Sequence, residues 1–410
     1  MADHRLNKFL SHNSQSFTLI EILITVAIIA VLMTVVVLAI NPTEITKKAR
    51  DTQRLTDMAN LEMLLQLARS EGMLNTSYCD GTKIYASLPS ETPLSNNNLP
   101  AGISWVQVSE DKIRNTDGTG WIPLNFKSLN YLQTSVLPVD PKNSLDNSLY
   151  YTFYCNPQRG YILTAYPESQ TFGPKGGKDS KTIGDGGPDP YVYEVGNNLF
   201  ISPLKPVGSW SFDEGAGTIV NDSSGNNNSG TLISGPTWTD GQVNKALSFD
   251  GTDDYVDMGN ISNFPTSATS PFTLELWWYR EEPLPDNAEM HMLAIGSPSE
   301  GKTRALGVTF RDGRTRLDYL GYNYNFILDI STHVGWHHAV ATMDNKHVKV
   351  YYDGGLVGET ILTVNDLVST QMYIGKGFWA NPFKGLIDEV RIYNRALSAG
   401  EIKRHYEMSK

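Results

Sequence analysis

The chain has 410 residues, of which 40% are hydrophobic and 19% are charged, so most of it must form folded parts, and more than one of them. Its formal net charge of -11 argues against nucleic acid as a partner, because phosphate backbones bind basic surfaces. The acidic balance suits a soluble protein surface. We therefore expect several globular parts and no nucleic-acid contact at the C-terminal domain described below.

The N-terminus carries the strongest pattern. A short polar leader, residues 1–16, contains Arg5 and Lys8 and precedes an almost wholly apolar run from Phe17 to Ile40. As a helix this run is about 36 Å long, which is enough to cross a bilayer and leave the basic leader on the cytoplasmic side. The run is too long for a signal peptide, and no small-x-small cleavage site follows it. We predict a single membrane-spanning helix over residues 17–40, with the bulk of the chain outside the cell.

One carboxylate, Glu21, interrupts the start of the apolar run. A lone carboxylate in a bilayer is costly, so this residue is expected to have a functional partner. Its surroundings, Ser16-Phe17-Thr18-Leu19-Ile20-Glu21, resemble the processing site of type IV prepilins and type II secretion pseudopilins.

That resemblance implies cleavage by a prepilin peptidase between Ser16 and Phe17, followed by N-methylation of Phe17. The family has Gly before the cut, where this chain has Ser16. In a filament of identical or related pilin subunits, Glu21 of one subunit would pair with the Phe17 amine of the next, which neutralises two charges that neither subunit buries alone.

Beyond the apolar run, Asn41-Pro42 predicts a kink in a long helix over residues 17–72. Apolar residues at helical spacing, then a glycine stop, mark its second half: Met58, Leu61, Leu65, Ala68 and Gly72. Just after the kink lies a basic cluster, formed by Lys47, Lys48, Arg50 and Arg54. This cluster has two interpretations, a solvated face or a contact with lipid headgroups or a neighbouring subunit.

Residues 73–200 contain short β-rich runs and turns, with strands expected at Tyr150–Cys155 and Tyr161–Tyr166. A long helix followed by a small antiparallel sheet resembles the pilin fold, an α+β class. The stretch Leu137-Pro138-Val139-Asp140-Pro141 is similar to one in the major pseudopilins.

The two cysteines, Cys79 and Cys155, both lie in this pilin-like globular part. Outside the cytoplasm they are expected to form a disulfide, and the alternative is a pair of buried thiols.

A loop rich in Gly, Pro and Asp at residues 173–190 also has two interpretations. Some pseudopilins bind calcium in a loop near the end of this domain, which suggests Asp179, Asp185 and Asp189 as ligands. The alternative is a solvated linker.

After a linker at residues 201–205, residues 206–410 alternate short β-rich runs with Gly, Asn and Asp turns, which predicts a β-sandwich. The expected strands include Phe272–Tyr279, Gly307–Phe310, Arg314–Tyr319, His337–Thr342 and Val348–Tyr352.

Several stretches of this half resemble LamG-like, concanavalin A-like domains, in the expected order. They are Trp210-Ser211-Phe212-Asp213-Glu214-Gly215, Asp222-Ser223-Ser224-Gly225-Asn226, Ala246-Leu247-Ser248-Phe249-Asp250-Gly251, Trp336-His337-His338-Ala339-Val340 and Gly385-Leu386-Ile387-Asp388-Glu389-Val390-Arg391-Ile392-Tyr393. The resemblance implies an all-β jelly-roll sandwich and a structural calcium ion at its rim. Asp213, Asp222 and Asp388 are the candidate ligands, and turn capping is the alternative role for them.

Sugar-binding sandwiches use exposed aromatic side chains for stacking. Trp277 and Trp278 are neighbours on a predicted strand, so one of them must point away from the core. Phe378 and Trp379 lie in a Gly-flanked loop and are the candidate ligand contacts, with packing beneath a loop as the alternative.

A concanavalin A-like enzyme needs two carboxylates facing each other across a cleft. The strand Phe272–Tyr279 offers only Glu275, and the chain contains no GxSxG or HExxH motif. We therefore predict a binding protein and not an enzyme.

Three functions remain open. The first is a type IV pilin-like subunit that carries a lectin-like domain for a carbohydrate or a surface protein. The second is a pseudopilin of a secretion or DNA-uptake machine, and the third is a membrane-anchored surface protein that does not polymerise.

Overall fold

The structure, a computed structural model, describes residues 18–74, 77–129, 134–281, 289–297, 302–311, 314–321, 324–329, 334–378 and 381–410. The side chains of residues 34–40, 97 and 308–329 are outside this description. The chain divides into two compact units, Met1–Lys47 and Lys48–Lys410, which are described separately.

The first unit consists of helix α1, Leu19–Ile40, and the start of α2, Pro42–Ser70. The predicted kink is a complete break between two helices. Asn41 adopts a left-handed conformation with φ 45°, and its side chain accepts a hydrogen bond from the N–H of Glu44 in the first turn of α2. Pro42 has no N–H to continue α1 and is well suited to start a helix. Within the part of the chain that the structure describes, no helix is both long and apolar enough to cross a membrane.

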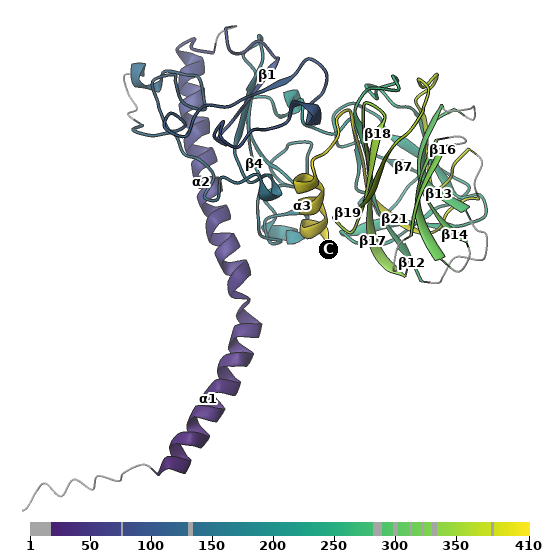
Figure 1. The fold of residues 1–410 in the computed structure, drawn as a ribbon, viewed down its shortest axis with the longest axis horizontal. Coiled ribbons are helices and arrows are strands. Elements are labelled where there is room, and N and C mark those ends of the chain that lie inside the picture. The colour runs from purple at the N-terminus through teal and green to yellow at the C-terminus, as the bar shows by residue number, and fades with distance from the viewer. Residues whose placement is uncertain are drawn as a thin grey trace, which may run out of the picture. The chain divides into compact units, whose positions relative to one another are not determined.

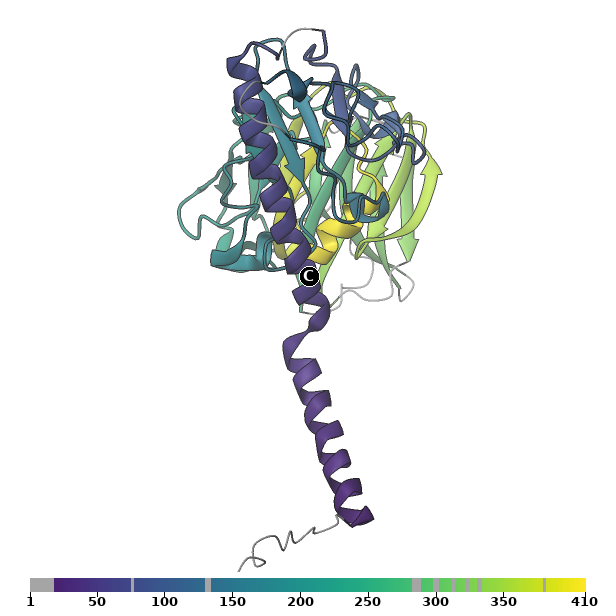
Figure 2. The ribbon, with the colours of Figure 1, turned by 90° about the vertical axis from the view of Figure 1, so that its left-hand side faces the viewer.

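In the second unit, α2 lies across one face of a five-stranded sheet (Figure 2). The strands run in the order β2-β1-β3-β4-β5. Their bounds are Ser104–Val106, Lys83–Ala86, Thr152–Cys155, Tyr161–Ala165 and Tyr193–Gly196, in that order. The sequence predicted an antiparallel sheet, but β1 and β2 are parallel, and the other three pairs are antiparallel. The residues predicted for the apolar face of α2 are buried against this sheet.

Short 3-10 helices connect these elements: η1 (Asn96–Asn98), η2 (Phe126–Ser128), η3 (Asp146–Ser148), η4 (Pro174–Asp179) and η5 (Leu199–Ile201).

The C-terminal half is a sandwich of two sheets (Figure 1). The first sheet has the order β19-β18-β17-β12-β21-β10-β9, with β6 also paired to β21. In that order the strands span Gly355–Ile361, His347–Tyr352, Gly335–Asp344, Phe272–Arg280, Lys384–Tyr393, Lys245–Asp250 and Thr237–Asp240, and β6 spans Gly208–Trp210.

The second sheet has the order β16-β15-β14-β13-β20-β11-β8-β7. These strands span Tyr324–Asp329, Arg314–Gly321, Thr303–Arg311, Glu289–Gly296, Gln371–Ile374, Tyr255–Asn260, Gly230–Ile233 and Ile219–Val220. Alternate residues of both sheets point inward and form one apolar core, which includes Trp210, Phe249, Trp278 and Ile392.

One element of this half was missed by the sequence analysis. Helix α3, Ala399–Ser409, follows the last strand and begins with a capping box, in which Ser398 and Glu401 bind each other's backbone N–H groups. Its Ile402 packs with Val340 and Tyr393 on the outer face of the first sheet. The helix lies between the sandwich and the five-stranded sheet (Figure 1).

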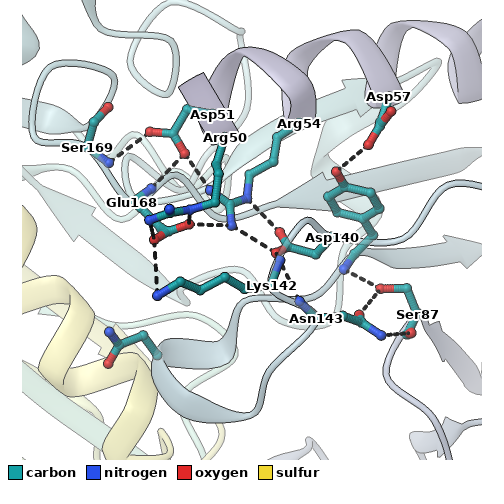
Figure 3. Close-up of polar contacts among 12 residues, drawn as sticks. Arg50, Asp51, Arg54, Asp57, Ser87, Asp140, Lys142, Asn143, Glu168 and Ser169 are labelled. Carbon is teal, nitrogen blue, oxygen red and sulfur yellow. Dashed lines mark hydrogen bonds and ion pairs between the residues drawn. The ribbon is translucent and has the colours of Figure 1, made fainter. Parts of the chain in front are cut away.

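A buried ion cluster around Arg54 fixes α2 to the loops of the five-stranded part (Figure 3). Arg54 is only 2% exposed, and its guanidinium binds Asp51 at 2.7 Å, Asp140 at 2.6 Å and Glu168 at 2.7 Å. Arg50 forms two further hydrogen bonds to Glu168, at 2.7 and 2.6 Å. Both predicted interpretations of the basic cluster are therefore wrong for these two arginines, which serve a structural ion cluster.

The pKa of Glu168 reflects this environment. Burial alone would raise it, but the hydrogen bonds and charges of Arg50 and Arg54 hold the pKa at about 2. Because the folded pKa is below the ordinary value of 4.5, the stabilisation is complete above pH 4.5 and is lost as the pH falls toward 2. Asp140, which lies in the pseudopilin-like stretch 137–141, belongs to the same ion cluster and helps to hold α2 in place through Arg54.

We expect Arg54→Met to lower the free energy of unfolding by about 3–5 kcal/mol, because it leaves buried carboxylates without their cation. Arg50→Met is the matched control and should cost about 1 kcal/mol or less, since that side chain is partly exposed. Urea unfolding of the full chain in detergent measures both. Lowering the pH from 7 to 3 should reduce the difference in the free energy of unfolding between Arg54→Met and wild type. An equal decrease in this free energy for Arg54→Met and Arg50→Met would contradict the structural role of Arg54.

Candidate functional site

The residues of the predicted processing motif begin helix α1. Ser16 and Phe17 lie outside the described residues, but Thr18 and Glu21 are described. The carboxylate of Glu21 accepts hydrogen bonds from the N–H and the hydroxyl of Thr18, both at 2.9 Å, and the N–H of Glu21 donates to the Thr18 hydroxyl. This is a capping box, which the Thr-x-x-Glu spacing encodes and the sequence analysis overlooked. It holds the Glu21 carboxylate at the residue that directly follows Phe17.

The structure joins Cys79 and Cys155 by a disulfide with an S–S distance of 2.05 Å. The bond connects the loop before β1 to the end of β3, and both residues are buried. A cross-link between residues 76 positions apart restricts the unfolded chain strongly.

The three candidate calcium ligands do not share one environment. Asp213 and Asp388 both face the turn that precedes β10: Asp213 accepts from the N–H of Lys245 at 3.0 Å, and Asp388 accepts from the N–H of Val243 at 2.9 Å. Asp222 instead caps its own loop, where it accepts from the backbone N–H groups of Ser209, Ser224 and Asn228. Turn capping, the alternative role, accounts for Asp222.

Asp388 is the least satisfied of these acids. It is 0% exposed, and its second oxygen, Oδ1, has no hydrogen-bond partner in the described part of the chain. Burial, and then the neighbouring charge of Glu389, raise its pKa well above the usual range. An ion bound beside Asp388 and Asp213 would supply the missing partner.

A different acidic group, Asp250, Asp253 and Asp254, brings three carboxylates within 4.8 Å of one another. Asp254 and Asp250 already accept hydrogen bonds from the backbone of their own turn, so this group carries no further assignment.

In the 173–190 loop, Asp185 accepts hydrogen bonds from the N–H groups of Gly187 and Glu194. Burial raises its pKa to about 7. Asp189 binds the N–H of Tyr191. Hydrogen bonds from backbone N–H groups therefore occupy carboxylate oxygens of both Asp185 and Asp189.

Trp277 and Trp278 point to opposite faces of β12, as the sequence predicted. Trp278 lies in the sandwich core, whereas Trp277 lies on the outer face and stacks on Tyr406 of α3 with ring centroids 5.7 Å apart. Both are buried, so neither is a ligand contact in this structure. His338 is likewise structural, because its Nε2 lies 2.8 Å from the buried carboxylate of Glu275.

Aromatic side chains gather instead on the outer face of the second sheet. Inward-facing Val256, Met372 and Ile374 alternate with outward-facing neighbours, which places Tyr255 and Tyr373 side by side with ring centroids 5.7 Å apart. Phe378 packs edge-on against Tyr373 at 5.5 Å.

The ammonium of Lys376 lies 3.1 Å from the ring centroid of Tyr255 and 4.3 Å from that of Tyr373. We call Tyr255, Tyr373, Lys376 and Phe378 the aromatic platform. Of these residues, the sequence analysis predicted only Phe378, from its Gly-flanked loop. The alternation of inward and outward residues along β11 and β20 could also have indicated the two tyrosines. The other candidate, Trp379, lies outside the described residues.

Comparison with known families identifies both ends of the chain. Residues 11–37 match the prokaryotic N-terminal methylation motif, and residues 250–403 match the concanavalin A-like lectin/glucanases superfamily. The chain thus combines a methylation motif with a LamG-like sandwich, which fits a pilin-like surface protein with a carbohydrate-binding domain. No curated protein sequence matches the chain.

Among solved structures, the chain resembles domain 4 of AbnA, an extracellular arabinanase from Geobacillus stearothermophilus, with 23% identity and a TM-score of 0.40 over 50% of this chain and 98% of that one. The binding domain of Paraclostridial Mosquitocidal Protein 1 matches with 15% identity and a TM-score of 0.40, over 49% and 52% of the two chains. Trypanosoma rangeli sialidase matches with 20% identity and a TM-score of 0.38, over 48% and 32%.

The unpartnered oxygen of Asp388 generates a prediction. We expect calcium to raise the melting temperature of the wild-type chain relative to chelator, because an ion that binds only the folded state stabilises it. Asp388→Asn should reduce this difference, and Asp222→Asn, whose carboxylate caps a loop, should retain it. Scanning fluorimetry with and without chelator makes the comparison. A wild-type melting curve that chelator does not move would show that the calcium prediction is wrong.

Proposed function

We propose that this chain is a type IV pilin-like subunit that is processed at Phe17, assembles into a surface filament and displays a carbohydrate-binding sandwich outside the cell. The observation that carries the proposal is the presence of a methylation motif and a LamG-like sandwich in one chain. The partners are prepilin peptidase, other pilin subunits, the membrane before assembly, and a glycan.

The N-terminal part supports assembly through its exposed apolar surface. Large apolar side chains from Leu19 to Met33 are 50–81% exposed along α1, so the helix requires an apolar environment. In the proposal this environment is first lipid and then a bundle of identical helices. Glu21 is the one acidic residue in that surface, and the amine of Phe17 on a neighbouring subunit is its proposed partner.

The five-stranded part supports the pilin-like interpretation by its order of elements. A long helix lies on a small sheet, and buried ion pairs hold the helix in place. A disulfide connects the loop before β1 to the end of β3. A pseudopilin of a secretion machine is the second candidate, favoured by the 137–141 stretch, in which Asp140 binds Arg54. Filaments on the cell surface separate the first candidate from the second.

The aromatic platform supports recognition of a sugar. Faces of aromatic rings pack against the apolar face of a pyranose, and an adjacent ammonium donates hydrogen bonds to its oxygens. We propose binding without hydrolysis, since the carboxylate of Glu275 is enclosed by two histidines and is 0% exposed.

Processing and assembly are tested together. Mass spectrometry of the protein from its own host should show an N-terminal methyl-Phe17, and an intact Met1 or Ala2 terminus would overturn the pilin-like function. Glu21→Gln should keep membrane insertion and lose most filament yield, because the amide keeps the size and removes the charge. Thr18→Ala is the control: it removes the capping hydroxyl, retains the carboxylate and should assemble. Equal filament yields from Glu21→Gln and wild type would contradict the role of the charge.

Sugar binding is tested on a glycan array with the full chain in detergent. Tyr373→Ala should weaken binding to the best glycan by about tenfold or more, because it removes the centre of the platform. Phe200→Ala, which removes an exposed aromatic side chain outside the platform, should leave binding unchanged. If Tyr373→Ala binds like wild type, the platform is not the lectin site.

A further inference from the structure

A second candidate site lies where the five-stranded part meets the end of the sandwich. A cavity of about 670 Å³, which we call the junction cleft, is lined by Trp105 of β2, by Tyr150 and Tyr166 beside β3 and β4, and by residues 398–401 and Lys403 at the start of α3. Its volume is in the range in which pockets hold small ligands, including short oligosaccharides. It does not include any residue of the aromatic platform.

The wall of the cleft is aromatic. The rings of Trp105 and Tyr150 meet edge to face, with centroids 6.1 Å apart and an interplanar angle of 82°. Trp105 is half-buried, so part of its ring faces the cleft. An aromatic corner of this kind is suited to the apolar face of a sugar ring.

Two tyrosine hydroxyls lack partners in this wall. Tyr150 is 6% exposed and Tyr166 is 4% exposed, yet neither hydroxyl has a hydrogen-bond partner among the described residues. Burial raises the pKa of both hydroxyls, so they stay protonated at neutral pH and each can donate a hydrogen bond. Neither oxygen is among the fully enclosed, unpartnered oxygens of the described chain, so both can be reached from the cleft, and a ligand there could accept a hydrogen bond from each.

The electrostatics of the cleft favour a negative group. Its cations are Lys142, Arg395 and Lys403, and its acids are Asp146 and Glu401. Glu401 is neutralised by Arg395 at 2.9 Å, and Lys142 has a longer contact of 3.6 Å to Glu168 outside the cleft. In the described chain, the N–H groups of Ala399 and Gly400 in the first turn of α3 have no acceptor. Such N–H groups and the helix dipole attract anions.

The cleft is held open by the fold. The guanidinium of Arg404 in α3 lies 3.4 Å from the ring centroid of Tyr166 and donates to the carbonyl oxygen of Asn147 on the opposite wall. The carboxyl of Glu401 is tied to the cap residue Ser398. Because both walls are fixed before a ligand arrives, little ordering is needed on binding.

From these features together we propose that the junction cleft is a second carbohydrate site, specific for a short oligosaccharide that carries a carboxylate. The sugar ring packs in the corner of Trp105 and Tyr150, its hydroxyls bind the hydroxyls of Tyr150 and Tyr166, and its carboxylate binds the first turn of α3 beside Lys403. The inference is independent of filament assembly and of the aromatic platform.

Isothermal titration of the full chain in detergent tests the proposal with four probes. These are trigalacturonic acid and 3′-sialyllactose as acidic saccharides, maltotriose as a neutral one, and pentaglutamate as an acidic peptide. We expect one or both acidic saccharides to bind about tenfold more tightly than maltotriose and pentaglutamate. Which of the two binds distinguishes a polyuronate from a sialylated glycan as the source of the ligand.

Variants then locate the site. Tyr150→Phe should weaken binding about fivefold, because it removes one hydroxyl and retains the ring. Tyr161→Phe is its control, since it removes a buried, unpartnered hydroxyl outside the cleft. Lys403→Gln should weaken binding about threefold and reduce its salt dependence, whereas Lys410→Gln, at the other end of α3, should not.

The proposal is overturned if neither acidic saccharide binds, if the neutral sugar or the peptide binds as well as they do, or if Tyr150→Phe and Lys403→Gln bind like wild type. Tyr373→Ala separates the two sites: it should weaken glycan binding at the platform by about tenfold or more and retain the binding of the acidic saccharide. Loss of acidic-saccharide binding in Tyr373→Ala would assign that ligand to the platform and reject the junction cleft.

Discussion

The buried carboxylate of Glu275 organises the join between the sandwich and the five-stranded part. It lies on β12 with 0% exposure and is bound by His338 of β17 at 2.8 Å and by His405 of α3 at 3.0 Å. Burial opposes its ionisation, but the charge of His405 and the hydrogen bonds of both histidines hold the pKa of Glu275 well below its usual range. A buried acid with two specific partners fixes geometry more than it adds net stability, because its contacts are offset by the cost of removing the charges from water. Removing either partner would still destabilise the fold, since it leaves a buried charge without compensation.

Contacts from the five-stranded part extend this cluster. The ring of Tyr191 stacks on His405 with centroids 4.1 Å apart, and its hydroxyl lies 2.8 Å from that of Ser409. Arg391 of β21 covers the same ring and donates to its hydroxyl at 3.0 Å. The predicted linker at residues 201–205 also packs against the sandwich. Leu204 is buried, and its carbonyl oxygen accepts a hydrogen bond from Arg395. These contacts join the sandwich to the five-stranded part within the second unit, and the junction cleft is lined by residues of both parts.

The sequence predicted what depends on local pattern. Strand positions in the sandwich were close to those observed, because alternation such as that of Phe272–Tyr279 records which side chains enter the core between the sheets, here Phe272, Leu274 and Trp278. The break at Asn41-Pro42 was found because proline has no N–H. Elements that depend on tertiary partners were missed. Helix α3 is rich in charged residues, and its buried Arg404 and His405 are explained only by Tyr166, Tyr191 and Glu275, which are distant in sequence. The basic cluster at Arg50 and Arg54 was misread because the carboxylates that bury it lie about a hundred residues away. Glu21 and Phe378 were found from motifs, whereas the tyrosines of the platform and the walls of the junction cleft come together only in the folded chain.

We expect the five-stranded part and the sandwich to form one cooperative body that carries the proposed ligand sites. Hydrogen exchange of the full chain across a urea series measures this directly, by following amides of β4 and β12. If the two parts are one body, both sets should lose their protection with the same opening free energy. Opening of β4 at low urea, while β12 keeps its full protection, would show that the sandwich is an independent module and would contradict the account.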